Sequence, residues 1–140
     1  MPRYRIDVHR RILFTETPGV VTEVNLRCLW RAIRRDSRME IGFDELHDHS
    51  AITSAEVSTG FLRDFTVSFK RYDDDGANEG ARIAIVAASD EVFGLSRMSQ
   101  ALREGSPPEF HVFRDMPPAR EWLGLPAEEE DSASAEWMDT

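Results

Sequence analysis

Cysteine is nearly absent from this sequence of 140 residues: Cys28 is the only one, so no internal disulfide can form. Long apolar runs are absent too, since the longest, at 83–88, is far shorter than the about 20 residues that span a bilayer. The first residues, MPRYRIDVHRRILF, lack the apolar segment of a signal peptide. These absences predict a soluble cytoplasmic protein without a membrane span, and the length predicts one domain.

Lysine is almost missing as well, because Lys70 is the only one and arginine carries nearly all of the positive charge. The net charge is −9, and residues 125–140 hold six acidic residues and no basic residue, which leaves −3 for residues 1–124. A negative chain of this kind is not expected to bind nucleic acid. The composition predicts a domain at 1–124 followed by an acidic, disordered tail at 125–140.

The sequence has none of the short patterns that mark common catalytic sites. It contains no G-x-S-x-G, no H-E-x-x-H and no Walker pattern, and Cys28 has no second cysteine beside it. We therefore expect no enzymatic activity and no cofactor.

The stretch at 81–98 is the clearest positive signal. An uninterrupted apolar run at 83–88 indicates a strand buried on both faces, as in a parallel sheet, and a helical pattern follows it. Ser89 and Asp90 lie at the joint between the two. Their oxygens can cap the helix, or the helix N-terminus behind them can hold an anion, and capping is the simpler interpretation.

The rest of the chain shows further strand and helix patterns. Strands are expected at 3–8, 11–15, 43–49 and 109–114, in addition to the central one. Helices are expected at 22–35, 54–72, 90–103 and 117–123. This order predicts an α/β fold with about five strands, as an N-terminal hairpin and then a mostly parallel sheet, and four helices. Strand 3–8 would form an edge that can pair two copies, so monomer and homodimer both stay open.

Helix 22–35 has an apolar side and a basic side. The residues expected to face the core are Val24, Cys28, Leu29, Ala32 and Ile33. The opposite side carries Arg27, Arg31 and Arg34. This basic side is interpreted first as a solvated surface, and alternatively as a docking surface for an acidic protein partner.

Helix 54–72 is the least certain element, because residues 65–69 also alternate like a strand. Thr53 and Glu56 have the spacing of a capping box, and a parallel strand at 82–88 needs a crossover before it. The helix would carry an aromatic stripe at its buried side, formed by Phe61, Phe65 and Phe69. Such a stripe usually fills a core, but it can also line a cavity.

His47 and His49 are the most suggestive pair of side chains. On a strand they point to the same face about 7 Å apart, a spacing that metal sites use. A metal would need a third ligand from Asp44, Glu45 or His111, and nothing in the sequence brings one there. Ordinary polar residues are the favoured interpretation.

Four segments of the second half carry a resemblance to a known family. They read RIAIVA at 82–87, FGLSRM at 93–98, VFRD at 112–115 and AREWLG at 119–124. In these segments the sequence resembles small bacterial proteins of the STAS fold, that of the SpoIIAA anti-sigma-factor antagonists, related in shape to CRAL-TRIO lipid-binding domains. The resemblance spans residues 3–124 and implies a right-handed β-α superhelix.

The resemblance also implies a regulatory position. SpoIIAA-like antagonists bind an anti-sigma kinase and are switched by phosphorylation of a serine at the start of the second helix. Ser54 lies at the corresponding place, with Ser50 in the loop before it. The antagonists carry an Asp-Ser-Ser-Gly pattern there, whereas this chain has Thr-Ser-Ala-Glu at 53–56, and capping explains Ser54 more simply.

Two functions follow from these patterns as hypotheses. The first is a non-enzymatic STAS-like module that acts in regulation by contact with another protein. The second is a carrier of a small molecule or lipid, of the CRAL-TRIO type, with the aromatic stripe lining its cavity.

Overall fold

The computed structural model describes residues 1–73, 80–105, 107–127 and 136–140. Within these ranges the chain forms eight strands and four helices. The strands are β1 (Arg3–Asp7), β2 (Ile12–Glu16), β3 (Gly19–Thr22), β4 (Asp44–Asp48), β5 (Ile52–Glu56), β6 (Arg82–Val86), β7 (Glu109–Phe113) and β8 (Met138–Asp139). The helices are α1 (Glu23–Arg35), α2 (Thr59–Asp73), α3 (Asp90–Leu102) and α4 (Met116–Trp122).

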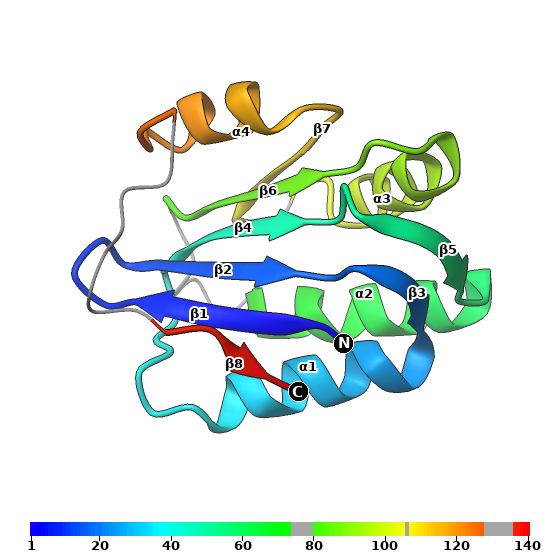
Figure 1. Ribbon diagram of the computed structural model, residues 1–140, viewed down its shortest axis with the longest axis horizontal. Coiled ribbons are helices and arrows are strands. Elements are labelled where there is room, and N and C mark those ends of the chain that lie inside the picture. Colours follow the sequence, from blue (N-terminus) through cyan, green and yellow to red (C-terminus); the bar gives the residue numbers. More distant parts are fainter. Residues whose placement is uncertain (74–79, 106, 128–135) are drawn as a thin grey trace.

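A six-stranded sheet forms the centre, in the order β7-β6-β4-β2-β1-β8. From β2 to β7 the neighbouring strands are parallel, and β1 pairs antiparallel with both β2 and β8. Helices α1, α2 and α3 lie on one face of the sheet and α4 lies on the other (Figure 1). Strands β3 and β5 form a separate parallel pair beyond the carboxyl ends of β2 and β4 (Figure 1).

Each central strand supplies two cores, because alternate residues of a strand face opposite sides of the sheet. Leu46 of β4 and Val86 of β6 pack in the cluster that contains Ala119 of α4. On the other face, Leu13 of β2 packs in the cluster that contains Leu29 of α1. The uninterrupted apolar run at 83–88 is thereby explained, since β6 is buried by helices from both sides.

The α/β class, the N-terminal hairpin, the mostly parallel sheet and the four helices are confirmed. This architecture is consistent with the SpoIIAA-like superhelix that the resemblance implies. The expected number of strands is wrong: β3, β5 and β8 raise it from about five to eight in the described part of the chain. Strands β3 and β8 are shorter than the others, and each of the three pairs with a strand distant in sequence. Among the described residues, none of the helices has the length and apolar content that crossing a membrane requires.

The expected start of the second helix is also wrong. Residues 53–56 belong to β5, whose backbone pairs with β3 instead of entering a helix. Helix α2 begins at Thr59, where the Ser58 hydroxyl accepts a hydrogen bond from the Phe61 N–H at 3.0 Å. The ambiguous residues 65–69 are helical, as the crossover argument predicts.

The buried side of α1 differs from the expected one. Thr22 caps the helix as predicted, its side chain accepting from the Asn25 N–H at 3.1 Å. Val24 is 68% exposed and Cys28 is exposed, so neither belongs to the core. The residues of α1 that face the rest of the molecule are Leu26, Leu29, Trp30 and Ile33. Leu29, Ala32 and Ile33 thus face the core as predicted, whereas Leu26 and Trp30 take the places expected for Val24 and Cys28.

The predicted disordered tail ends in a strand. Residues 128–135 of that tail lie outside the described part of the chain, but β8 pairs Arg3 with Asp139 and Tyr4 with Met138. Trp137 lies over two arginines of β1, with its ring 4.3 Å from the Arg3 guanidinium carbon and 5.0 Å from that of Arg5. The prediction of disorder is therefore wrong for residues 136–140.

Replacing Trp137 with alanine should lower the free energy of unfolding by about 1–2 kcal/mol, because two cation–π contacts and the packing of a half-buried ring are lost. Urea denaturation checks this. Met138→Ala is the matched control, since this neighbouring side chain is 41% exposed and should cost less than about 0.5 kcal/mol. Equal costs for the two variants would show that the Trp137 contacts contribute nothing.

Candidate functional site

A cavity of about 600 Å³ lies between the sheet and helices α1, α2 and α3. This volume falls within the about 300–1,000 Å³ of small-molecule sites. Most of its wall is apolar or aromatic, and all three helices and several strands contribute. Prominent lining side chains are Leu26, Leu29, Trp30, Ile33, Ile52, Leu62, Phe65, Phe69, Ile83, Ile85, Val92, Leu95 and Phe110.

The floor of the cavity carries a polar row from β4. Glu45, His47 and His49 are alternate residues and line the cavity, whereas Leu46 between them faces α4. Strand β6 lies beside this row with apolar side chains, its Ile85 paired with His47. Polar residues at the centre of a buried sheet are unusual. Their hydrogen-bond partners therefore determine which of these side chains is available to a molecule in the cavity.

His47 is buried, and both of its ring nitrogens are occupied. Nδ1 is hydrogen-bonded to the Thr15 hydroxyl at 2.6 Å, and Nε2 to a carboxylate oxygen of Glu45 at 2.8 Å. The ring of Trp30 lies 5.6 Å away, between centroids. These partners fix the imidazole and leave neither nitrogen facing an empty position.

His49 stays neutral. Burial lowers its pKa to about 3, and the neighbouring His47, with its ring centroid 6.2 Å away, acts in the same direction. In the described ranges no side-chain hydrogen bond forms at the His49 ring, which leaves its nitrogens available to a molecule in the cavity.

The two histidines share one face, as the strand pattern predicts. However, the described residues contain no cluster of three or more side chains suited to a metal ion. His111, one of the suggested third ligands, packs against Trp122 at 4.7 Å between ring centroids and does not line the cavity. The described residues therefore supply no metal centre at His47 and His49.

The roof of the cavity is aromatic. Trp30 of α1 and Phe69 of α2 meet edge to face at 4.7 Å between centroids, and Phe65 lies 5.0 Å from Phe69. Two arginines of α1 lie on α2 rings: Arg27 over Phe61 at 5.1 Å and Arg34 over Phe69 at 5.0 Å. Phe65 and Phe69 of the aromatic stripe thus line the cavity, whereas Phe61 does not, and Phe61 and Phe69 contact the basic side of α1.

The basic residues of α1 have different surroundings. Arg27 and Arg34 are exposed but stack on phenylalanine rings, whereas Arg31 is exposed and does not line the cavity. A docking role for these three arginines stays a prediction.

The predicted serine sites lie outside the cavity lining. Ser54 is half-buried within β5, paired with Val20, so it does not lie at the start of a helix as the resemblance implies. Ser50 is exposed in the turn after β4, where its hydroxyl contacts the Asp48 carboxylate at 2.5 Å. Regulation through either serine stays a prediction.

Ser89 and Asp90 have local partners. The Ser89 hydroxyl caps α3 by accepting from the Val92 N–H at 3.2 Å. The exposed Asp90 carboxylate accepts from Arg114 at 2.8 Å, and that guanidinium lies 3.9 Å from the Phe93 ring. Anion binding at this joint stays a prediction.

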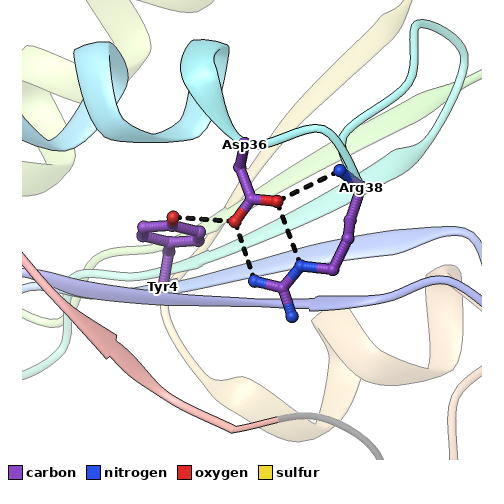
Figure 2. A network of polar contacts seen from close by, with 3 residues as sticks. All are labelled: Tyr4, Asp36 and Arg38. Atoms are coloured by element: carbon purple, nitrogen blue, oxygen red, sulfur yellow. Dashed lines mark hydrogen bonds and ion pairs between the residues drawn. The ribbon is translucent and has the colours of Figure 1, made fainter.

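A network of polar contacts lies at the start of the loop that lines part of the cavity (Figure 2). Figure 2 shows the Asp36 carboxylate between Tyr4 and Arg38: it accepts from the Tyr4 hydroxyl at 2.9 Å and from the Arg38 guanidinium at 2.7 and 3.0 Å. The Arg38 hydrogen bonds hold the Asp36 pKa well below its usual range, whereas burial raises the pKa of Tyr4. Residues 39–43 follow directly and line the cavity.

The Asp36→Asn substitution should lower the free energy of unfolding by about 2 kcal/mol at pH 7, because charge-assisted hydrogen bonds are lost. A carboxyl group with a lowered folded pKa stabilises above its unfolded value, 3.8, and loses this effect as the pH falls below it. The difference from wild type should therefore stay constant from pH 7 to pH 5 in urea denaturation. Ser37→Ala, at an exposed neighbour, is the control, and an equal cost there would contradict the prediction.

The cavity was not predictable as a site from the sequence, although two signals point toward it. The aromatic stripe of α2 and the polar alternation of β4 both suggest lining residues, but neither indicates that the space between them is hollow.

No family model and no curated protein matches this sequence. Among solved structures, the chain is similar to an uncharacterized protein of the DUF3478 family with a SpoIIAA-like fold from Shewanella loihica PV-4. The two share 18% sequence identity over 80% of this chain and 83% of that chain, with a TM-score of 0.49.

Proposed function

We propose that this protein is a non-enzymatic, STAS-like module that binds a small apolar molecule in the cavity between the sheet and α1, α2 and α3. The observation that carries the proposal is the cavity itself, with about 600 Å³ enclosed mainly by apolar side chains. A concave, mostly apolar space of this volume is the usual form of a small-molecule site.

The few polar groups in the cavity fit a binding role. His47 is held by Glu45 and Thr15, so it acts as a fixed part of the wall. His49 is neutral and can donate or accept one hydrogen bond, which orients a ligand without requiring a charge. This combination of apolar wall and few polar groups is typical of small-molecule sites.

A fluorescence titration of the full chain with the neutral probe 1-aminoanthracene tests the proposal. We expect saturable binding of one probe per chain, with energy transfer from Trp30 because its ring lines the cavity. The Trp30→Phe variant should lose more of the transfer than Trp122→Phe, because Trp30 lines the cavity and Trp122 does not. Absence of saturable binding by the folded protein would overturn the proposal.

A regulatory protein contact is the second candidate, and the outer surface of α1 favours it. Val24 is 68% exposed beside the exposed Arg27 and Arg31, in a chain whose net charge is −9. An acidic partner with an apolar side chain would fit this surface. If this contact exists, a partner recovered with the wild type should be lost with Arg31→Glu and kept with Arg63→Glu, an exposed arginine of α2.

A further inference from the structure

Hydrogen bonding divides the polar side chains of the cavity floor into two groups. Glu45 and His47 are joined at 2.8 Å, and the other ring nitrogen of His47 is hydrogen-bonded to Thr15 at 2.6 Å. His49 lines the same floor, and within the described ranges its ring makes no hydrogen bond. A polar group in an apolar site is destabilising when it is left without a hydrogen-bond partner, and a ligand can supply that partner.

The tautomer of His47 is fixed by its partners, whereas that of His49 is open. A carboxylate only accepts, so in neutral His47 the proton lies on Nε2, beside Glu45, and Nδ1 accepts from the Thr15 hydroxyl. Among the described residues no side chain assigns the proton of His49 to one nitrogen in this way. A hydroxyl group both donates and accepts, so it can pair with either tautomer of His49.

The surroundings of His49 favour a neutral ligand group. Burial lowers the pKa of His49 to about 3, so at pH 7 its ring offers no positive charge to an anion. The Glu45 carboxylate lines the same floor and repels an anion, and its hydrogen bond to His47 competes with a cation. On the helix side, Thr66 and Ser99 line the cavity with neutral hydroxyls. A neutral hydrogen-bonding group therefore suits this floor best.

The aromatic roof of the cavity favours an aromatic skeleton in the ligand. The ring of Phe69 meets Trp30 at 4.7 Å and Phe65 at 5.0 Å between centroids, both edge to face, and Phe110 adds a further ring to the lining. Aromatic rings attract one another in this geometry because their edges are positive and their faces negative. A planar aromatic ligand can join such an arrangement, whereas a saturated ring lacks this charge distribution.

We infer that the ligand is a neutral aromatic compound with a hydroxyl group, which forms a hydrogen bond with the ring of His49. The inference rests on the proposed function, because it names the ligand class of the same cavity. Phenols and aromatic alcohols share the required chemistry, since both join an apolar ring to a single group that donates and accepts.

Equilibrium dialysis of the full chain against 2-naphthol and 2-methylnaphthalene tests the hydrogen bond, because the probes share one ring system and differ in a hydroxyl against a methyl group. The preference is the ratio of the two affinities. His49→Phe keeps a ring that cannot hydrogen-bond and should lower the preference for 2-naphthol at least about tenfold. His49→Gln, which donates and accepts, should stay within about threefold of wild type. His111→Phe, at an exposed histidine outside the cavity lining, should leave the preference unchanged.

Decahydro-2-naphthol, an alcohol with a saturated skeleton, tests the aromatic part of the inference. Phe65→Leu should lower the preference for 2-naphthol over this alcohol about threefold, because an aromatic ring of the roof is lost. Phe61→Leu is the matched control on the same helix, since Phe61 does not line the cavity.

An unchanged preference for 2-naphthol over 2-methylnaphthalene in folded His49→Phe would overturn the inference, as would equal effects of Phe65→Leu and Phe61→Leu. Should His49→Phe not fold, His49→Leu removes the same hydrogen bond. If 1-aminoanthracene binds and the preference does not depend on His49, the inference fails while the proposed function stands. If neither 1-aminoanthracene nor 2-naphthol binds, the proposed function fails as well.

Discussion

Lowering the pH from 7 to 4 should reduce the free energy of unfolding by about 3 kcal/mol through His49 alone. The pKa of His49 is about 3 in the folded protein, against 6.5 for an ordinary histidine. The unfolded chain therefore binds the proton more readily than the folded protein. Between the two pKa values, each unit by which the pH falls lowers the free energy of unfolding by about 1.4 kcal/mol. This stability is complete above pH 6.5 and is lost as the pH falls toward 3.

The His49→Phe variant isolates this effect, because phenylalanine keeps a ring in the cavity and does not titrate. Urea denaturation at several pH values between 7 and 4 should show most of the slope in wild type and little of it in the variant. The Asp36 carboxyl stays ionised in both states over most of this range, since its unfolded value is 3.8, so it does not produce the slope. Parallel slopes for wild type and His49→Phe would show that His49 is not buried in neutral form.

Filling the cavity with Thr66→Trp should weaken 1-aminoanthracene binding at least a hundredfold. Thr66 lies on α2, is 4% exposed and lines the cavity, and its hydroxyl donates to that of Ser99 at 3.3 Å. An indole at this position occupies the space that the probe needs. Because the side chain enters a hollow and does not displace packed atoms, the overpacking cost should stay below the about 1–3 kcal/mol of a filled core.

Val67→Trp is the control for this experiment, because Val67 is the next residue of α2 and is 37% exposed. It adds an indole to the same helix outside the cavity lining and should leave probe affinity unchanged. Direct excitation of the probe avoids interference from the added indole. Should Thr66→Trp not fold, Ser99→Phe fills the cavity from α3, and unchanged probe affinity in a folded cavity-filling variant would place the probe elsewhere.

The sequence predicts local structure well where a segment carries its own signals. The run at 82–88 with Ser89 after it predicts β6 and the capped start of α3, and both are found. Thr22 predicts the start of α1 for the same reason. The two caps are made within a few residues, and the strand is marked by its own continuous apolar side chains although its hydrogen bonds are made to β4 and β7.

Elements that depend on a distant partner were not predictable in this way. By themselves, residues 53–56 have the sequence pattern of a helix start. They form a strand because their backbone pairs with β3, and this pairing is not visible in the local sequence. The short strand β8 forms by pairing with β1, which lies more than a hundred residues earlier in the chain. The exposure of Cys28 and Val24 likewise follows from how α1 is rotated on the sheet.

The candidate site was predictable only in part. The pairing of His47 and His49 on one face follows from the period of a strand, and the aromatic stripe of α2 follows from the period of a helix. What the stripe and the histidines enclose depends on the distance between three helices and a sheet. That distance is set by packing across the whole domain.

The pairing of β8 with β1 has a consequence for self-association. Exposed strand edges are templates on which further chains can add, and natural proteins cover them. In the part of the chain that the structure describes, β8 covers the outer edge of β1 at Arg3 and Tyr4, while β7 forms the opposite border of the sheet. A second copy that paired along the whole of β1 would have to displace β8, so the C-terminal residues restrict such pairing to the part of β1 beyond Tyr4.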